Sequence, residues 1–465
     1  MNSQEKFDRF VTRYPHDHTW FWKRPEYSRR QWIQALGAGV AGYFAHGPAN
    51  KLFAQQVWSA SVRMQSKAKN LIFVLMGGAP SHVDTFDLKE VAGVTPTSFQ
   101  PETLGELRFP VGLLPRTAEQ MQHIAIVRSM RSWSAVHGLA QTWTQIGRNP
   151  VSALGRVAPH MGSIVAIEKS PEKAPTQVFP AFLGLNVATN SPGQGYLPSA
   201  YAPFRTGPSA AGLGNTTHPA GAARFGDRFT LLHELDDPLR QNSPMGRQAE
   251  DMDAFYSAAR GLMYNPTVDN AFRYTAAESQ RYGNTGFGNA CLTAKQVLAA
   301  NMGTRFVQIN VGGWDHHSNI YAANVLPTLA RTFDSGFATL ISDLAASGLL
   351  DETLIVAMGE FGRTVGPLSP QGGRDHFLQQ FVLFAGAGIK GGRAIGATNP
   401  SGAFTIDSGW GRQRDIRMED VEATMYSALG INWTTIRYDD PFRRGFEYVP
   451  FAREDVYGPI DELWA

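Results

Sequence analysis

The chain has 465 residues, which is enough for two or three domains or for one large α/β domain with long insertions. Its 42 Lys and Arg residues nearly balance its 40 Asp and Glu residues, so the charge bias typical of nucleic-acid binding is absent and we expect no nucleic-acid partner. A single cysteine, Cys291, excludes an internal disulfide framework and a cysteine-based zinc cluster. Any metal site must therefore use histidine and carboxylate ligands.

A pair of arginines precedes an apolar, glycine-rich stretch near the N-terminus. Tyr27-Ser28-Arg29-Arg30 is followed by WIQALGAGVAGYFA at residues 32–45. This pattern over residues 28–45 is typical of a twin-arginine export signal. We therefore predict an N-terminal arm over residues 1–65, export by that pathway and a periplasmic or envelope-associated location, with an uncleaved signal serving as an anchor. The alternative is an amphipathic surface helix with two incidental arginines.

Short apolar runs alternate with amphipathic segments over residues 66–465, which is typical of a single α/β domain. We predict a large, mostly parallel central sheet between helix layers. The predicted strands are Leu71–Met76, Ile124–Val127, Gln177–Leu185, Phe306–Val311, Leu354–Met358 and Phe381–Ala385. The predicted helices are Glu250–Met263, Ala290–Met302, Asp334–Leu349 and Met418–Leu429, the last ended by Gly430.

Residues 186–242 are rich in Gly, Pro, Ser and Ala and follow neither the helical nor the strand period. We interpret them as a long loop excursion over the sheet edge. A loop of this length usually has a function or forms an interaction surface. We therefore expect contacts with protein partners or with a membrane-associated complex through this loop and through residues 1–45.

Chemically reactive side chains follow three of the predicted strands at the points where these strands end. The segments are GGAPSHVDTFD at 77–87, GGWDHHSN at 312–319 and GEFGRT at 359–364, and GGRDH follows soon after at 372–376. Because the carboxyl ends of parallel strands lie along one edge of a sheet, we expect these segments to converge there. Glycine at each strand exit lets the backbone turn sharply and approach a ligand closely.

The converging groups are carboxylates and histidines: Asp84, Asp315, Glu360, Asp375, His82, His316 or His317, and His376. Four carboxylates in one pocket repel one another unless a cation lies among them. Mixed oxygen and nitrogen ligands suit a divalent ion, and the choice among Zn²⁺, Mn²⁺, Mg²⁺ and Ca²⁺ stays open. Arg363 or Arg374 would then hold an anion. In the alternative reading no ion is bound: Asp84 and Asp87 cap a turn, and Arg374 pairs with Glu360.

His137 begins an apolar helical stretch that runs to Ile146 and Gly147. The free amide N–H groups at a helix start favour anions, so His137 is a candidate site residue. The alternative is a structural role, which is the more common one for a lone histidine.

Six segments together resemble the domain of unknown function 1501 (DUF1501) family, within the alkaline phosphatase and sulfatase-like superfamily. They are GGAPSHVDTFDLK (77–89), HGLAQTWTQIGR (137–148), HMGSIV (160–165), GGWDHHSN (312–319), GEFGRTVG (359–366) and GGRDHF (372–377). The resemblance implies a large mixed sheet between helix layers. In active members of the superfamily it also implies one or two metal ions and a Ser, Thr or Cys nucleophile that hydrolyse phosphate or sulfate esters.

The resemblance extends to individual residues only in part. Asp315 and His317 resemble the metal-binding Asp and His that follow a central strand, and His376 resembles a late histidine before another strand. Glu360-Phe361 stands where active members have Asp-His, so one histidine ligand is missing from the motif.

Two functions follow from these observations. The first is an exported metal-dependent hydrolase that takes a small anionic phosphate or sulfate ester. Its metal ligands are then Asp84, Asp315, His317, Glu360, Asp375 and His376, and its catalytic residues are Ser81, His82, His137 and Arg363. Ser81 is the candidate nucleophile with His82 or His137 as its base, unless water attacks directly. The second is a catalytically degenerate hydrolase scaffold that serves as a structural subunit of an envelope-associated complex.

Overall fold

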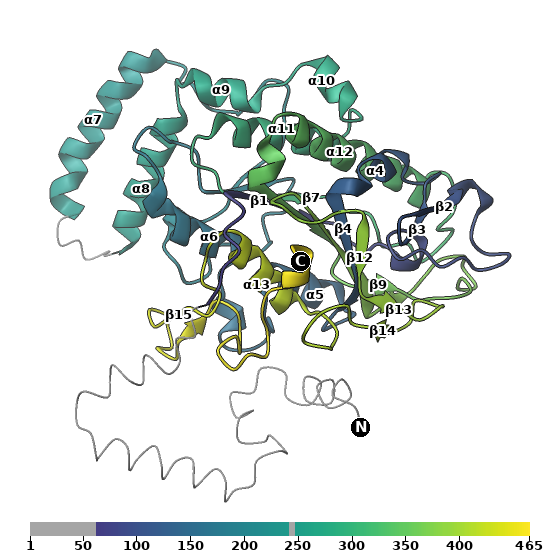
Figure 1. The fold of residues 1–465 in the computed structure, drawn as a ribbon. Coiled ribbons are helices and arrows are strands. Elements are labelled where there is room, and N and C mark those ends of the chain that lie inside the picture. The colour runs from purple at the N-terminus through teal and green to yellow at the C-terminus, as the bar shows by residue number, and fades with distance from the viewer. Residues whose placement is uncertain (1–61, 241–246) are drawn as a thin grey trace, which may run out of the picture.

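Figure 1 shows the computed structural model, which describes residues 62–240 and 247–465. The predicted twin-arginine segment at 28–45 and most of the predicted arm at 1–65 lie outside the described residues. An eight-stranded sheet forms the centre, in the order β12-β4-β11-β8-β1-β7-β5-β6. Its strands are β1 (Asn70–Leu75), β4 (Ile124–Arg131), β5 (Phe182–Leu185), β6 (Phe204–Thr206), β7 (Phe306–Asn310), β8 (Thr353–Met358), β11 (Gln379–Ala385) and β12 (Arg393–Ile395).

The strands form where apolar runs are buried on both faces of the sheet. Along β1, Leu71 and Phe73 lie in one hydrophobic core, while Ile72 and Val74 lie in the other. All six residues of β1 are buried. A sheet covered on both faces requires such continuous apolar runs rather than alternating ones.

Helices cover both faces of this sheet (Figure 1). On one face, α11 and α12 share a core with Ile72 and Val74, and α4 packs against α12. On the other face, α5, α6 and α13 share a core with Leu71 and Phe73. The prediction of a large sheet between helix layers is confirmed. The helices are α4 (Pro115–Glu119), α5 (His137–Ile146), α6 (Met161–Lys169), α7 (Gly221–Arg240), α8 (Arg247–Leu262), α9 (Pro266–Phe272), α10 (Ala276–Arg281), α11 (Gly286–Ala300), α12 (Leu326–Ala346) and α13 (Met418–Ala428).

One strand of the sheet runs against the others. β11 pairs antiparallel with both β4 and β8, whereas the other pairings within this sheet are parallel. The prediction of a mostly parallel sheet is confirmed, and β11 is the exception to the parallel direction, because a buried apolar run is compatible with either direction. As a result, the start of β11 lies at the sheet edge where β1, β7 and β8 end.

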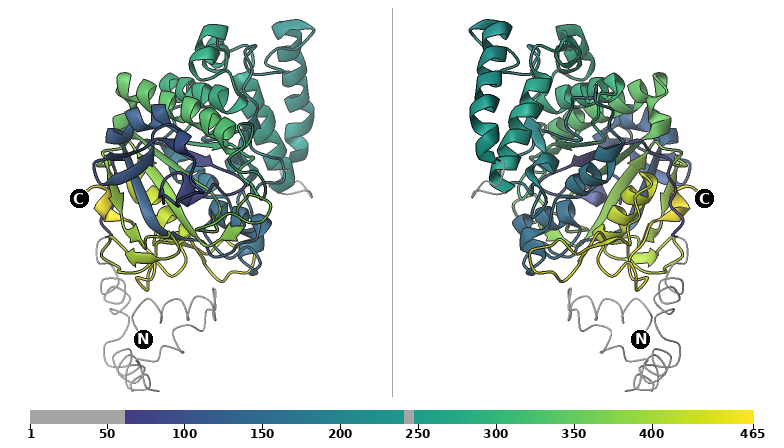
Figure 2. Two further views of the ribbon diagram at one scale, coloured as in Figure 1. Left: turned by 90° about the vertical axis from the view of Figure 1, so that its right-hand side faces the viewer. Right: turned by 90° about the vertical axis from the view of Figure 1, so that its left-hand side faces the viewer.

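The predicted loop at 186–242 contains regular structure in its described part. It adds β6 to the edge of the sheet and then forms α7, a helix of 20 residues. Figure 2 shows α7 and α8 projecting beyond the sheet and its helix layers. The side chains of Leu231 and Leu235 are exposed, so α7 lacks the buried apolar stripe by which a helix is recognised in a sequence. Within the described ranges, no helix is long and apolar enough to cross a membrane.

Four two-stranded sheets accompany the central sheet in the described part of the chain. They pair β2 (Pro101–Leu104) with β3 (Leu107–Pro110), β9 (Gly362–Arg363) with β10 (His376–Phe377), β13 (Ala397–Thr398) with β14 (Thr405–Asp407), and β15 (Ile436–Arg437) with β16 (Phe446–Glu447). The pairing of β9 with β10 places Arg363 opposite His376.

Candidate metal centre

Separate segments of the chain deliver polar side chains to one edge of the central sheet. The loop after β7 carries Asp315 and His317, and β9, which follows β8, carries Arg363. His376 lies in β10, directly before the reversed strand β11. His137 is the first residue of α5, which follows β4. The strand exits and the start of β11 therefore meet, as the sheet topology requires.

His137, Asp315, His317 and His376 form what we call the histidine cluster. Each offers one ligand atom, and these four atoms lie within 4.8 Å of one another. Oδ1 of Asp315 lies 2.8 Å from Nε2 of His317 and 3.2 Å from Nε2 of His137. The same oxygen lies 3.6 Å from Nε2 of His376. Solvent reaches the cluster, because the side chains of Asp315 and His317 are 45% and 44% exposed.

The ring of His376 is oriented by the backbone. Its Nδ1 atom lies 2.8 Å from the carbonyl oxygen of Ala135. A carbonyl oxygen only accepts hydrogen bonds, so Nδ1 carries the proton and donates it. The lone pair of Nε2 then points into the histidine cluster.

Glu360 and Asp375 orient the rings of His137 and His317 in the same way, with Nδ1 facing the carboxylate and Nε2 facing the cluster. His137 Nδ1 lies 2.7 Å from Oε1 of Glu360. His317 Nδ1 lies 2.9 Å from Oδ1 of Asp375. A carboxylate behind a histidine fixes its tautomer and makes the opposite nitrogen a better ligand. Glu360 and Asp375, both predicted as metal ligands, thus lie behind the rings rather than among the converging atoms.

The converging atoms fit a divalent cation. Nε2 of His317 and Nε2 of His376 lie 3.1 Å apart, and two lone pairs at that distance repel unless a proton or a cation lies between them. A tetrahedral ion with bonds of about 2.0–2.1 Å to its ligands holds those ligand atoms about 3.3 Å apart. Four of the six separations among these atoms, at 2.8, 3.1, 3.2 and 3.6 Å, bracket that value, and all six are within 4.8 Å. Three imidazoles and one carboxylate are also a donor set that zinc accepts.

The guanidinium of Arg363 contacts the histidine cluster from the protein interior. Its Nη2 lies 2.5 Å from Oδ1 of Asp315, and its Nη1 lies 3.3 Å from Nε2 of His317. The other N–H groups donate to the backbone oxygens of Gly78, Ala79 and Arg374. The side chain is 1% exposed, so Arg363 is a fixed cation beside Asp315.

Neighbouring charges set the protonation of the cluster. Burial by itself raises the pKa of Asp315, but Arg363 and the nearby histidines outweigh it and lower this pKa to about 2. The hydrogen bond to Glu360 raises the pKa of His137. Burial lowers the pKa of His376, which favours its neutral form. Asp315 is therefore an anion throughout the physiological pH range.

Glu360 is held in a fully buried position behind His137. Its Oε1 atom also accepts hydrogen bonds from Nε2 of Gln141 and from the backbone N–H of Gly78, each at 2.9 Å. Gly78 has a φ of 102°, and a Cβ atom on it would lie 2.7 Å from the backbone nitrogen of Asp315. Only glycine therefore lets the end of β1 approach this loop.

Phe361 takes the place where the family resemblance expects a histidine ligand. Its ring centroid lies 4.7 Å from that of His137 and 4.7 Å from that of His376. Phe361 thus packs against two rings of the cluster. The third imidazole of the cluster comes instead from His137, at the start of α5.

Asp84, another predicted metal ligand, lies outside the histidine cluster. Its fully buried carboxylate accepts hydrogen bonds from Arg374 Nε at 2.6 Å, Ser81 Oγ at 2.6 Å and Tyr321 OH at 2.8 Å. These donors occupy both of its oxygens, so Asp84 belongs to a buried ion pair. Arg374 therefore pairs with Asp84, and not with Glu360 as the alternative reading has it.

Ser81 and His82, the predicted nucleophile and one of its predicted bases, are buried in the same region. Ser81 is 2% exposed and donates its hydroxyl hydrogen to Asp84. His82 has Nε2 2.9 Å from the backbone oxygen of Gly402, and its Nδ1 accepts from the backbone N–H of Arg363 at 3.4 Å. Burial lowers the pKa of His82. Both side chains are thus engaged with partners outside the cluster.

The sequence left open whether His316 or His317 reaches the site. His317 belongs to the histidine cluster, and His316 does not.

A cavity of about 380 Å³ lies beside His137 and Asp315. Its lining includes uncharged polar side chains that the sequence analysis missed: Gln141, Gln145, Asn190, Ser191 and Asn310. Gln308 fixes two of these amides, because its Nε2 lies 3.0 Å from Oε1 of Gln145 and 2.9 Å from Oδ1 of Asn310. Gln141 follows His137 by four residues on α5, and this spacing on one helix face is the signal that could have found it.

Solved structures with a similar fold include the lipoteichoic acid synthase LtaP from Listeria monocytogenes, with 11% identity and a TM-score of 0.37. That match covers 84% of this chain and 78% of that chain. The PsFucS1 sulfatase from Pseudoalteromonas sp. matches with 12% identity and a TM-score of 0.38, over 83% and 72% of the two chains. The alkaline phosphatase from the Antarctic bacterium TAB5 matches with 15% identity and a TM-score of 0.33, over 69% and 92%. Likenesses at this level carry no conclusion about activity.

No curated protein sequence matches the chain. A family model described as "Protein of unknown function (DUF1501)" matches residues 68–444, which is well over half of the chain. The resemblance seen in the six sequence motifs is confirmed, and the chain belongs to the DUF1501 family.

Proposed function

We propose that this protein is an exported, metal-dependent hydrolase of phosphate or sulfate esters. The observation that carries the proposal is the convergence of three Nε2 atoms and one carboxylate oxygen in the histidine cluster. A set of atoms this close and this rich in electron pairs is costly without a cation. Carboxylates or a backbone oxygen behind each ring are the usual support for histidine ligands.

His137, Asp315, His317 and His376 are the residues that would hold the ion. A divalent ion bound there supplies Lewis acidity toward an ester oxygen and toward water. Glu360 and Asp375 keep the rings of His137 and His317 in the ligand tautomer. Because Ser81 is committed to Asp84, we propose that water, and not a side-chain hydroxyl, is the nucleophile.

Arg363 is placed to bind the anionic part of such an ester. Three of its N–H groups are fixed on backbone oxygens, and the other two point at Asp315 and His317. Those two N–H groups lie on the adjacent terminal nitrogens Nη1 and Nη2, the pair with which a guanidinium can bind two oxygens of one oxyanion. They become free for a substrate when Asp315 and His317 direct their electron pairs to an ion.

The test compares alanine variants of two adjacent histidines, one inside the histidine cluster and one outside it. Elemental analysis of the purified protein should find a divalent metal, and the protein should hydrolyse an aryl phosphate or an aryl sulfate. His317→Ala should lose both metal and turnover, whereas His316→Ala should keep both. A wild-type protein without metal and without turnover would contradict the proposal and leave the structural-subunit reading in its place.

Export rests on the sequence of residues 28–45 alone. The expected result is that replacing Arg29 and Arg30 by Lys leaves the protein in the cytoplasm, while the unchanged chain is recovered from the cell envelope. Equal fractionation of the two forms would rule out a twin-arginine signal.

A further inference from the structure

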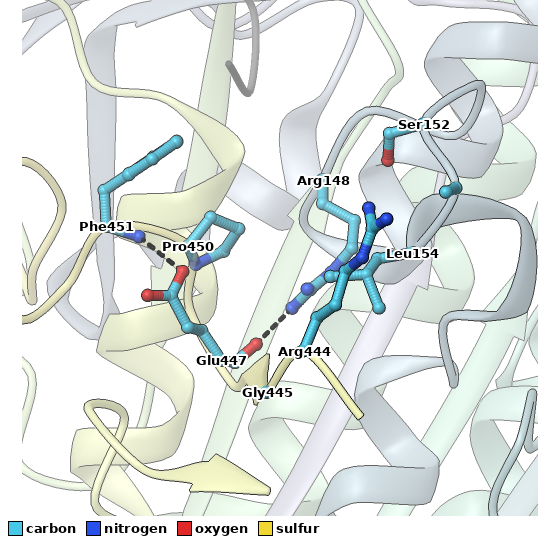
Figure 3. A pocket seen from close by; sticks show the side chains of 9 residues that line it. Arg148, Ser152, Leu154, Arg444, Gly445, Glu447, Pro450 and Phe451 are labelled. Atoms are coloured by element: carbon cyan, nitrogen blue, oxygen red, sulfur yellow. Dashed lines mark hydrogen bonds between the residues drawn. The ribbon is translucent and has the colours of Figure 1, made fainter. Parts of the chain in front are cut away.

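A second polar cavity lies away from the histidine cluster and contains a buried arginine. It has a volume of about 210 Å³ and lies between the segment after α5 and the segment around β16. Figure 3 shows Arg148 and Arg444 side by side in this cavity, with Ser152 and Leu154 on one side and Glu447 on the other.

Arg148 is a buried cation that makes no salt bridge within the described part of the chain. It is 5% exposed, and in the described part of the chain no carboxylate lies within salt-bridge distance of it. Its hydrogen bonds go to backbone oxygens, including those of Glu447 and Tyr448, and its guanidinium lies 3.8 Å from the ring centroid of Phe446. Burial lowers its pKa, but an arginine with an ordinary pKa above about 12 stays charged at neutral pH. A buried charge that lacks a partner is costly.

The two nearby carboxylates, Glu422 and Glu447, attract Arg148 only from beyond salt-bridge distance. Burial raises the pKa of Glu422 to about 8, which keeps this carboxyl largely neutral at pH 7. Glu447 turns its side chain away from Arg148, and its Oε2 accepts the backbone N–H of Phe451 at 3.0 Å (Figure 3). The cavity is therefore positive on its arginine side.

Arg444 adds a second positive charge to the same cavity. The buried carboxylate of Asp440 accepts the backbone N–H groups of Phe442, Arg444 and Gly445, and so fixes the turn that carries Arg444. The residue is exposed, and its side chain extends beside that of Arg148 (Figure 3). Two like charges held together repel unless an anion joins them.

We propose that Arg148 and Arg444 form a binding site for a dianionic oxyanion, either phosphate or sulfate, free or as the terminal group of a larger ligand. Two guanidinium groups match a ligand with two negative charges and several acceptor oxygens. The volume of the cavity suits one such group rather than an extended molecule.

This site is distinct from the histidine cluster. His137 is the first residue of α5, and Arg148 follows the last residue of that helix, Ile146, by two positions. A helix of ten residues is about 15 Å long, so the two sites lie near opposite ends of α5. The anion site does not depend on the hydrolase activity proposed above.

The experiment measures binding of sodium phosphate and sodium sulfate by calorimetry, with sodium acetate as a monoanion control. It uses the Asp315→Asn variant, so that the histidine cluster does not dominate the signal. We expect one saturable site for phosphate or sulfate, and Arg444→Gln should weaken it by at least about tenfold, since a guanidinium that contacts an oxyanion in two places is lost. Arg443→Gln removes the same charge from the neighbouring exposed position and should leave the affinity unchanged.

Arg148→Gln should abolish binding, but this buried change can also unfold the protein. The Arg444→Gln variant is therefore the decisive test. The proposal is overturned if the Asp315→Asn protein shows no saturable binding, or if Arg444→Gln and Arg443→Gln bind alike. Acetate bound as tightly as sulfate would overturn the assignment to a dianion. Comparison of the phosphate and sulfate isotherms decides which oxyanion the site prefers.

Discussion

Nε2 of His317 lies 3.1 Å from Nε2 of His376, although the far nitrogen of each ring already faces a hydrogen-bond acceptor. Two ring nitrogens that face each other at this distance are a stronger indication of a cation-binding site than the number of acidic residues nearby. On the far side of these two rings, the carboxylate of Asp375 supports His317 and the backbone oxygen of Ala135 supports His376.

Asp375→Ala should weaken metal binding without abolishing it. The change removes the acceptor of the His317 Nδ1–H group but leaves the four converging atoms in place. Removal of such a support typically lowers metal affinity by about 10–100-fold. A competition titration with a chromogenic chelator gives the affinity. Asp351→Ala, at an exposed position in a short 3₁₀ helix, is the matched control and should behave as the wild type.

Two glycines close to the site should respond in opposite ways to alanine. In Gly78→Ala the new Cβ meets the backbone nitrogens of Asp315 and Trp314 at 2.7 and 2.8 Å, at a φ of 102°. We expect a loss of about 1–3 kcal/mol of unfolding free energy together with weaker metal binding. A Cβ on Gly138 has nothing within 4 Å, so Gly138→Ala in α5 should be neutral or slightly stabilising. Denaturant unfolding curves measure both, and equal effects would contradict the close approach at Gly78.

Asp84→Asn should destabilise the fold and spare the metal. This carboxylate and Arg374 are both fully buried, and breaking one side of such a pair costs about 3–5 kcal/mol. Metal content per folded chain should stay at the wild-type value, because Asp84 lies outside the histidine cluster. If the folded Asp84→Asn variant lost its metal, Asp84 would have to be a metal ligand after all. The exposed pair of Glu90 and Arg108 provides the contrast, and Glu90→Gln should change stability little.

Glu419 and Glu422 should each contribute a fall in the stability of the protein as the pH rises from about 5 to about 8. Burial raises the pKa of Glu419 to about 7 and that of Glu422 to about 8, from an ordinary value of 4.5. At these two carboxyls the folded chain therefore binds more protons than the unfolded chain between pH 4.5 and 8, and their contribution to the unfolding free energy decreases across that window. Their stabilising contribution is complete below pH 4.5 and lost above pH 8.

Glu422→Gln should flatten this pH dependence, because an amide stays neutral. Urea unfolding at pH 5, 7 and 9 gives the slope, and Glu102→Gln at an exposed position of β2 is the control. An unchanged slope in Glu422→Gln would assign the pH dependence to other groups.

Much of the fold followed from the sequence, because buried strands leave a plain signal. The apolar runs of β1, β7 and β8 end in glycines followed by polar side chains, and this pattern located both the sheet and its reactive edge. The reversed direction of β11 left no such signal, since an apolar run has no direction. α7 was missed because its leucines, such as Leu231, are exposed. The helix therefore has no periodic apolar face by which a sequence pattern would reveal it.

The sequence predicted which segments form the candidate site, but not how their side chains are arranged within it. Strand exits placed Asp315, His317 and His376 on the correct sheet edge, but spacing does not say whether a carboxylate lies in front of a histidine ring or behind it. Glu360 and Asp375 lie behind, which depends on side-chain geometry after folding. The ion pair of Asp84 with Arg374 is equally invisible in the sequence, because the two residues are 290 positions apart.

The histidine cluster joins residues 137, 315, 317 and 376, so it exists only when α5, the β7 exit and the start of β11 are assembled. An ion held there acts as a cross-link between distant parts of the chain that the unfolded chain cannot reproduce. Its binding free energy is therefore also folding free energy, and the melting temperature should rise with the concentration of free metal. Conversely, chelation should make this edge of the sheet the first part of the domain to exchange its amide hydrogens.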